Sequence, residues 1–190
     1  MPPPPPPPRR VINTDPLAQT FSLTKEAFIE SIDIRVTTLP DEFLGIALTE
    51  TSVGIPDSTR VLDVKEILRK DLTVNTWSNF KFTNPVYLNE GREYAFIVYT
   101  TDATAEVGVS ELGQYDLLNK RWITNQSFNN GVLLSSSNAN TWSPIQKEDL
   151  TFKINKAVFE PKVTYDLGTT SVTDKTDLMV LADLSYMQVL

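Results

Sequence analysis

Alternating apolar and polar positions recur along the chain from Phe21 onward, and they predict a series of short β-strands. Ser31–Thr37 is the clearest example, because Ile32, Ile34 and Val36 would share one face of a strand. Further strands are predicted at Gly45–Thr49, Thr59–Leu62, Trp77–Phe82, Ala105–Ser110, Gly131–Ser135 and Leu150–Phe159. Asn-Glu-Gly and Asn-Asn-Gly sequences between some of these runs are typical of turns.

Glu93–Thr101 differs from the other runs because both sets of alternating positions are apolar, from Tyr94 to Tyr99. A strand that is apolar on both faces is typical of the covered centre of a sheet. We therefore expect this segment to be a central strand.

Two local signals predict interruptions of the strand pattern. Asp63 followed by Glu66 resembles a capping box and predicts one helical turn at Val64–Arg69, with Ile67 and Leu68 facing inward. Asn84-Pro85 predicts a turn, and Gly91 predicts a sharp return with positive φ.

Short strands separated by turns, without a helix long enough for a parallel crossover, predict an all-β fold. We expect an antiparallel β-sandwich, jelly-roll-like, over residues 15–160. Phe21 is expected to anchor its first strand in the core.

The two ends of the chain differ from this pattern. Pro2–Pro8 is a run of seven prolines, which predicts an extended polyproline leader over residues 1–14. We favour a stiff spacer over a ligand for an aromatic groove. Residues 161–190 include the apolar stretches Leu178–Leu184 and Met187–Leu190, which predict a strand of a further element, a self-association element or a truncated end.

Composition excludes several function classes. The net charge of −7 disfavours binding to nucleic acid, because like charges repel. The chain has no cysteine and no histidine, which excludes disulfides, thiol nucleophiles and triads that depend on histidine. No apolar run is long enough for a membrane helix, and export through a signal peptide is not expected.

Four strings, in their order and spacing, carry a resemblance to a known family: Asp15–Phe21, Phe80–Val98, Ser137–Pro144 and Glu148–Ile154. Together they resemble a β-rich domain of tailed-bacteriophage structural proteins, which are baseplate, tail or fibre components. The resemblance spans residues 13–160. It implies a virion protein, assembled in the host cytoplasm, that acts through neighbouring tail proteins or in host attachment, and it brings no catalytic residues and no cofactor.

Aromatic residues are the candidate ligand contacts, because exposed rings stack on sugar faces. Trp122 is the strongest candidate, since it lies in the polar stretch Tyr115–Gln126, and Tyr115 is a further candidate from that stretch. Trp77 and Trp142 are weaker candidates. The alternative for all of them is burial in a core or an interface.

Acidic residues give no clear catalytic or metal site. Neighbours in the pairs Asp41-Glu42 and Glu148-Asp149 would point to opposite faces of a strand, so neither pair forms a glycosidase dyad by itself. No calcium-loop motif is present, and Asp166, Asp174 and Asp177 read as solubilising charges.

The sequence therefore predicts a non-enzymatic structural component of a phage tail that acts through protein–protein interfaces and is open to homo-oligomerisation. The alternative is a receptor-binding module that recognises a bacterial surface glycan. A polysaccharide depolymerase has little support, because its chemistry would rest on Asp, Glu or Tyr alone.

Overall fold

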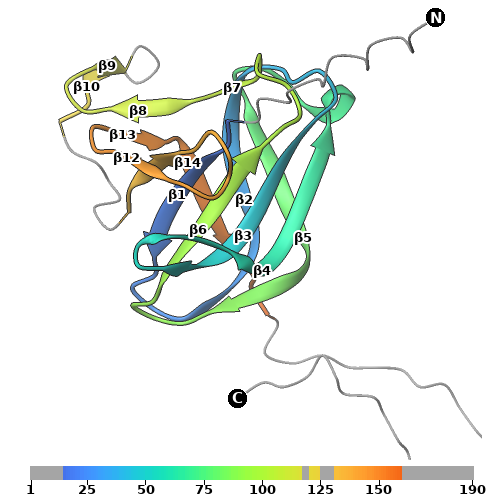
Figure 1. The fold of residues 1–190 in the computed structure, drawn as a ribbon, viewed down its shortest axis with the longest axis vertical. Helices are drawn as coiled ribbons and strands as arrows, with labels where there is room; N and C mark the ends of the chain where they lie inside the picture. The colour runs from blue at the N-terminus through green and yellow to red at the C-terminus, as the bar shows by residue number, and fades with distance from the viewer. Residues whose placement is uncertain (1–14, 117–119, 125–130, 160–190) are drawn as a thin grey trace, which may run out of the picture. The chain divides into compact units, whose positions relative to one another are not determined.

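The computed structural model describes residues 15–116, 120–124 and 131–159, which form two antiparallel sheets packed together (Figure 1). The strands are β1 (Leu17–Ser22), β2 (Ala27–Thr38), β3 (Phe43–Ser52), β4 (Ile55–Leu68), β5 (Trp77–Leu88), β6 (Glu93–Tyr99), β7 (Glu106–Val107), β8 (Val109–Glu111), β9 (Tyr115–Asp116), β10 (Arg121–Trp122), β11 (Leu133–Ser135), β12 (Ser143–Ile145), β13 (Glu148–Leu150) and β14 (Phe152–Lys156). A 3₁₀ helix, η1 (Arg69–Asp71), follows β4. The antiparallel β-sandwich predicted from the sequence is confirmed.

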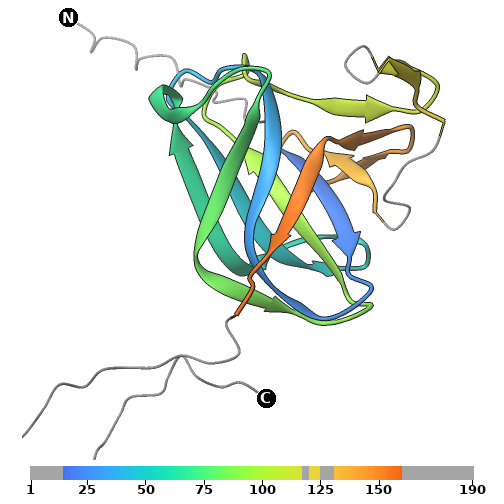
Figure 2. The ribbon, with the colours of Figure 1, turned by 180° about the vertical axis from the view of Figure 1, so that it is seen from behind.

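The larger sheet has the strand order β12-β11-β1-β6-β3-β4. The smaller sheet has the order β14-β2-β5, with β7 also paired to β2, and it faces the viewer in Figure 2. Two further pairs, β8 with β13 and β9 with β10, extend from one side of the sandwich (Figure 1). The finer prediction of a jelly-roll strand order stays a prediction.

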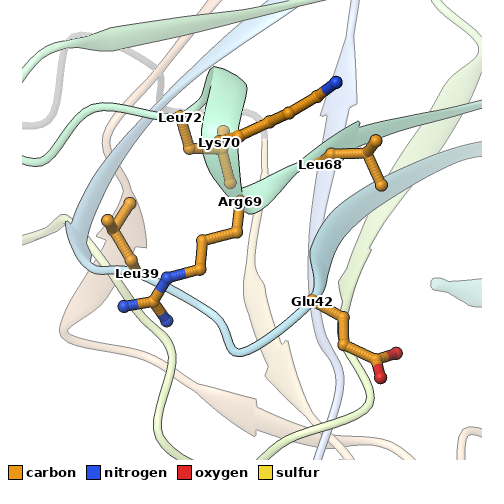
Figure 3. A pocket seen from close by; sticks show the side chains of 6 residues that line it. All are labelled: Leu39, Glu42, Leu68, Arg69, Lys70 and Leu72. Atoms are coloured by element: carbon orange, nitrogen blue, oxygen red, sulfur yellow. The ribbon is translucent and has the colours of Figure 1, made fainter.

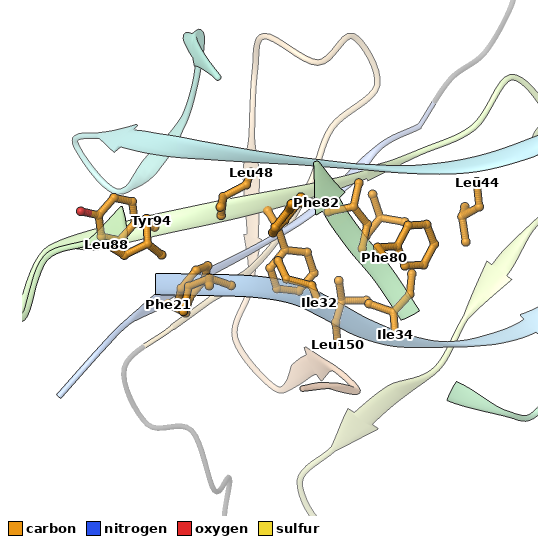
Figure 4. Close-up of a cluster of buried hydrophobic side chains, with 14 of the residues drawn as sticks. Phe21, Ile32, Ile34, Leu44, Leu48, Phe80, Phe82, Leu88, Tyr94 and Leu150 are labelled. Atoms are coloured by element: carbon orange, nitrogen blue, oxygen red, sulfur yellow. The ribbon is translucent and has the colours of Figure 1, made fainter. Parts of the chain in front are cut away.

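Alternating side chains from both sheets meet in one hydrophobic core (Figure 4). Phe21 of β1, Ile32 and Ile34 of β2, Phe80 of β5 and Leu48 of β3 are almost completely buried. Each such side chain contributes about 1.5–3 kcal/mol through the apolar surface that it removes from water. The predictions that Phe21 anchors β1 and that Ile32 and Ile34 share one face are confirmed.

β6 is a central strand, as predicted from its two apolar faces. It pairs with β1 on one side and with β3 on the other. Tyr94 and Phe96 point into the core, and Ala95 on the opposite face is also fully buried.

The predicted helical turn at Val64–Arg69 is wrong. The segment from Asp63 to Leu68 pairs with β3 in unbroken register, so its backbone groups are satisfied by the sheet, and η1 begins only afterwards. The carboxylate of Asp63 accepts a hydrogen bond from the backbone N–H of Val64 at 2.7 Å, which is a local contact within a strand. Ile67 packs against the core, whereas Leu68 is 53% exposed rather than facing inward.

The predicted turn at Asn84-Pro85 is also wrong, because both residues lie within β5. The register of β5 against β2 shifts there, between the pairs Lys81–Ser31 and Val86–Ile29. A proline is tolerated at this point because β5 is an edge strand and the pairing is interrupted.

Other local predictions have mixed outcomes. Gly91 has the expected positive φ of 68°, and its N–H donates to the carbonyl of Leu23 at 2.9 Å. The strand expected at Ala105–Ser110 is divided at Gly108 into β7 and β8. Residues 1–14 and 161–190 lie outside the described residues, so the predictions about the leader and the tail stay predictions.

Candidate binding surfaces

Tyr115 and Trp122 lie together on the projecting hairpin of β9 and β10. They are direct cross-strand partners, and their rings meet edge to face with centroids 5.3 Å apart. Trp122 is 64% exposed and Tyr115 is 42% exposed, so the pair presents aromatic surface to solvent. Hydrogen bonds between the backbones of Gln114 and Ile123 and of Gly113 and Ile123 extend the hairpin. Of the three tryptophans, Trp122 is the most exposed, as expected; its role in glycan contact stays a prediction.

Trp77 lies elsewhere, at the start of β5 and opposite Arg35 of β2. Its ring is 41% exposed, and the ammonium of Lys153 lies 3.9 Å from the ring centroid. This cation–π contact helps to hold the ring in place, because the negative face of an indole attracts a cation. Trp77 is therefore a surface residue rather than a core residue.

Trp142 occupies a third location, in the loop between β11 and β12, and it is half-buried. The loop is organised by Asn138, whose Oδ1 accepts hydrogen bonds from the backbone N–H groups of Asn140 and Thr141. The sequence candidates thus lie on three different elements, and only Tyr115 and Trp122 are brought together.

The outer face of the smaller sheet carries a network of fixed polar side chains. Asn79 of β5 donates from Nδ2 to Ser31 Oγ at 2.8 Å and to Asp33 Oδ1 at 2.5 Å. Asn155 of β14 donates to the same two atoms from the other side, at 3.0 and 2.8 Å. Asp33 and Ser31 of the central strand β2 are thus fixed by both neighbouring strands, and Trp77 lies on the same face.

A second aromatic pair lies farther along this face. Phe28 of β2 and Tyr87 of β5 are cross-strand partners with ring centroids 5.1 Å apart, and both side chains are exposed. The hydroxyl of Tyr87 donates to Glu26 at 2.9 Å, which raises the pKa of the phenol. Aromatic residues therefore lie on both sides of the polar network.

This surface was missed in the sequence because of the irregular pairing of β2. Phe28 has the same parity as Ile32 and Ile34, so strict alternation would place it in the core. The register of β2 shifts between Ile29 and Ser31, which buries Ile29 and turns Phe28 outward. In the sequence, the sign of this irregularity is that Phe28 and Ile29 are adjacent apolar residues, which breaks the alternation.

The outer face of the larger sheet has a different character. Directly opposed positions across its six strands are all apolar: Pro144, Leu134, Ala18, Ile97, Ala47 and Val64. Leu134, Ala18 and Ala47 are buried, so this row is accessible mainly toward its ends. The row ends at β4, an edge strand with five exposed large apolar residues: Ile55, Val61, Leu62, Val64 and Leu68. Clusters of exposed apolar residues on a folded domain are typical of interaction surfaces.

A depression of about 640 Å³ lies beside η1, at the end of β4 (Figure 3). It is lined by Leu39, Glu42, Leu68, Arg69, Lys70 and Leu72. The guanidinium of Arg69 donates to the carbonyl of Pro40 at 2.6 Å and lies 3.8 Å from the carboxylate of Asp41. The lining combines leucines with cations and offers no arrangement of a nucleophile with a base.

The two residues of the acidic pair Glu148-Asp149 differ in burial. Asp149 is almost fully buried, whereas Glu148 is only partly buried. Asp149 Oδ1 accepts from the Gln19 amide at 2.9 Å, while its Oδ2 has no hydrogen-bond partner. Burial raises the pKa of this carboxyl above its ordinary value, and the Gln19 hydrogen bond opposes the shift.

Within residues 15–116, 120–124 and 131–159, no group of three or more acidic residues is arranged to hold a metal ion. The same residues include no helix long and apolar enough to span a membrane.

No protein-family model, curated protein or solved structure matches this chain. The resemblance to tailed-phage structural domains therefore stays a prediction.

Proposed function

We propose that the protein is a non-enzymatic structural component of a bacteriophage tail, in a baseplate or a fibre, and that it acts through protein–protein interfaces. The observation that carries this proposal is the edge of the larger sheet. Among the described strands, β4 is the last of this sheet and pairs only with β3, and the side chains of Val61, Val64 and Leu68 on it are exposed. Such an edge is suited to pairing with a strand of another chain.

The resemblance of residues 13–160 to tail domains supplies the class of partner: other tail or baseplate proteins of the same particle. The test is immunogold labelling of purified particles from the source of the chain, with an antibody raised against the folded domain. Labelling of the tail at a regular position is the expected result. Particles that carry no label and no peptide of this chain by mass spectrometry would contradict the proposal.

The Tyr115–Trp122 pair favours a second function, the recognition of a bacterial surface glycan. Two rings meeting edge to face on a projecting hairpin present apolar surface that a sugar ring could cover.

If the hairpin is the glycan site, saturating host polysaccharide changes the tryptophan fluorescence of the protein and Trp122→Ala abolishes this change. Trp142→Ala serves as the matched control, because Trp142 lies on another loop. A response that persists in the Trp122→Ala variant would exclude the hairpin as the site.

A further inference from the structure

The outer face of the smaller sheet is organised as a strip with aromatic residues at both ends and a fixed polar network between them. We propose that this strip binds an extended, hydroxyl-rich saccharide chain that lies along the strands. The inference concerns a surface other than the Tyr115–Trp122 hairpin, and it does not depend on the protein being part of a tail.

The polar centre of the strip is preorganised. The carboxylate of Asp33 requires donors, so it sets the orientation of both amides, with the Nδ2 groups of Asn79 and Asn155 toward it. The Oδ1 atoms of both amides and the second oxygen of Asp33 are then available as acceptors for hydroxyl groups. Because three strands hold these groups, little side-chain freedom is lost when a ligand binds.

Donors surround these acceptors on the same face. Arg35 lies next to Asp33 along the outer side of β2, and its guanidinium is held by a hydrogen bond to the carbonyl of Asn75 at 3.1 Å. Lys153 is the cross-strand partner of Asp33, and its ammonium lies over the Trp77 ring, where its remaining N–H groups can donate. Lys81, the partner of Ser31, pairs with Glu30 at 2.6 Å. A sugar hydroxyl both donates and accepts, so a face that alternates donors with acceptors suits it.

The aromatic ends set the length of the ligand. Trp77 pairs with Arg35, and Tyr87 pairs with Phe28, so the ends are seven residues apart along β2. At about 3.3 Å per residue, this separation is about 23 Å, which is longer than any single sugar. The geometry thus favours several linked sugar units, with apolar sugar faces on Tyr87 and on the part of the Trp77 ring that Lys153 leaves exposed.

Other ligand classes fit this face less well. Nucleic acid would bring phosphates toward Asp33, Glu30 and Glu26 on a chain whose net charge is −7. A docked protein would have to desolvate the polar centre without matching it. The exposed apolar residues of the edge strand β4, on the opposite sheet, are the better surface for a protein.

The experiment uses the full chain and an array of purified bacterial capsular and lipopolysaccharide O-chain polysaccharides, followed by titration with oligosaccharide fragments of the best binder. We expect Trp77→Ala and Asp33→Asn each to reduce affinity by about tenfold, the loss of one stacking contact or one charge-assisted hydrogen bond. In ¹⁵N-correlated spectra, the side-chain amide signals of Asn79 and Asn155 should shift on binding.

Trp122→Ala is the matched control and should leave this affinity unchanged. Loss of binding in Trp122→Ala with retention in Trp77→Ala would overturn the proposed strip and assign binding to the hairpin. Failure of every polysaccharide on the array to bind would also overturn it. Neither result would contradict the tail assignment, which particle labelling tests separately. The thermal midpoint of each variant, expected to match that of the parent, distinguishes a lost contact from a lost fold.

Discussion

Asp149 carries a buried carboxylate at a junction between β13 and β1. The amide of Gln19 donates to Asp149 Oδ1, and Gln19 Oε1 accepts from the backbone N–H of Leu150 at 2.9 Å. Gln19 thereby satisfies one carboxylate oxygen and one backbone amide, while Asp149 Oδ2 lacks a partner. Burial therefore shifts this carboxyl toward its protonated form relative to water, against the hydrogen bond from Gln19, and the pKa is raised.

This site predicts an unusual pH dependence. The pKa of Asp149 in the folded state is raised above its ordinary value of 3.8, so the folded state binds this proton more tightly than the unfolded state. Its contribution to stability is therefore fully present below the unfolded pKa and is lost as pH rises through the folded pKa. We expect Asp149→Asn to raise the free energy of unfolding at pH 7 by about 1 kcal/mol, measured by urea denaturation.

Asp102→Asn is the control with the opposite sign. Burial acts to raise the pKa of Asp102, but hydrogen bonds from the backbone of Asp41 and from Thr104 and Thr100 outweigh it and hold the pKa well below its usual range. Its contribution is present above the unfolded pKa and is lost as pH falls toward the folded pKa, so Asp102→Asn should destabilise at pH 7. Equal destabilisation by both substitutions at pH 7 would contradict the account of Asp149.

Gly131 illustrates a second constraint at the scale of a residue. A Cβ at this position would lie 2.0 Å from the carbonyl oxygen of Thr20, which belongs to the backbone of β1 and cannot move aside. At Gly45, a Cβ would meet the ring of Tyr99, which can swing away with loss of its hydrogen bond to Glu66.

We therefore expect Gly131→Ala to destabilise the fold by about 3 kcal/mol, the upper range for overpacking, and Gly45→Ala to cost about 1 kcal/mol. Thermal and chemical denaturation of the two variants would check the order. A smaller effect at Gly131 than at Gly45 would show that β11 can separate from β1 without cost.

At the scale of elements, β4 is the strand most suited to assembly. Val61 and Val64 oppose Thr49 and Ala47 of β3, on the outer face of the larger sheet, and both are exposed. We expect the double variant Val61→Lys/Val64→Lys to keep a free energy of unfolding within about 0.5 kcal/mol of the parent, because exposed positions contribute little to the core. Its incorporation into particles should fall sharply, as measured by immunogold counts.

The matched control for this surface is Thr59→Lys, which adds a charge to the same strand at a polar, exposed position. Normal incorporation of both variants would show that β4 does not contact a neighbour in the particle. Reduced incorporation of both variants would indicate a general effect of added charge rather than a contact made by Val61 and Val64.

Some elements could be predicted from the sequence, and others could not. The central position of β6 followed from its two apolar faces, and the burial of Phe21 in the core was also predicted, although the bounds of β1 were not. At β4, the local capping signal of Asp63 and Glu66 pointed to a helix, but pairing with β3 satisfied more backbone groups than one helical turn could. Pairing between distant strands is not visible in a local window, and the register shift in β2 that turns Phe28 outward was hidden for the same reason.

At the scale of the whole molecule, the two outer faces differ in chemistry. One presents exposed apolar residues along its edge strand β4, and the other presents a polar strip between aromatic residues. The sandwich itself could be predicted, because strand periodicity and turn residues are local. The grouping of Asp33, Asn79 and Asn155 could not, because three strands far apart in the sequence supply it.

The pairing of β14 with β2 has a consequence for how the chain folds. Ser31 and Asn155 are separated by 124 positions in the sequence. At about 5–20 residues per second, a ribosome needs about 6–25 s after Ser31 to reach Asn155. During this interval β2 lacks its β14 partner from Ile29 to Ile34, although β5 and β7 are already available to pair with it. Contacts of such long range also slow folding itself. The nascent chain should therefore depend on chaperones, and truncation before Phe152 should yield insoluble protein.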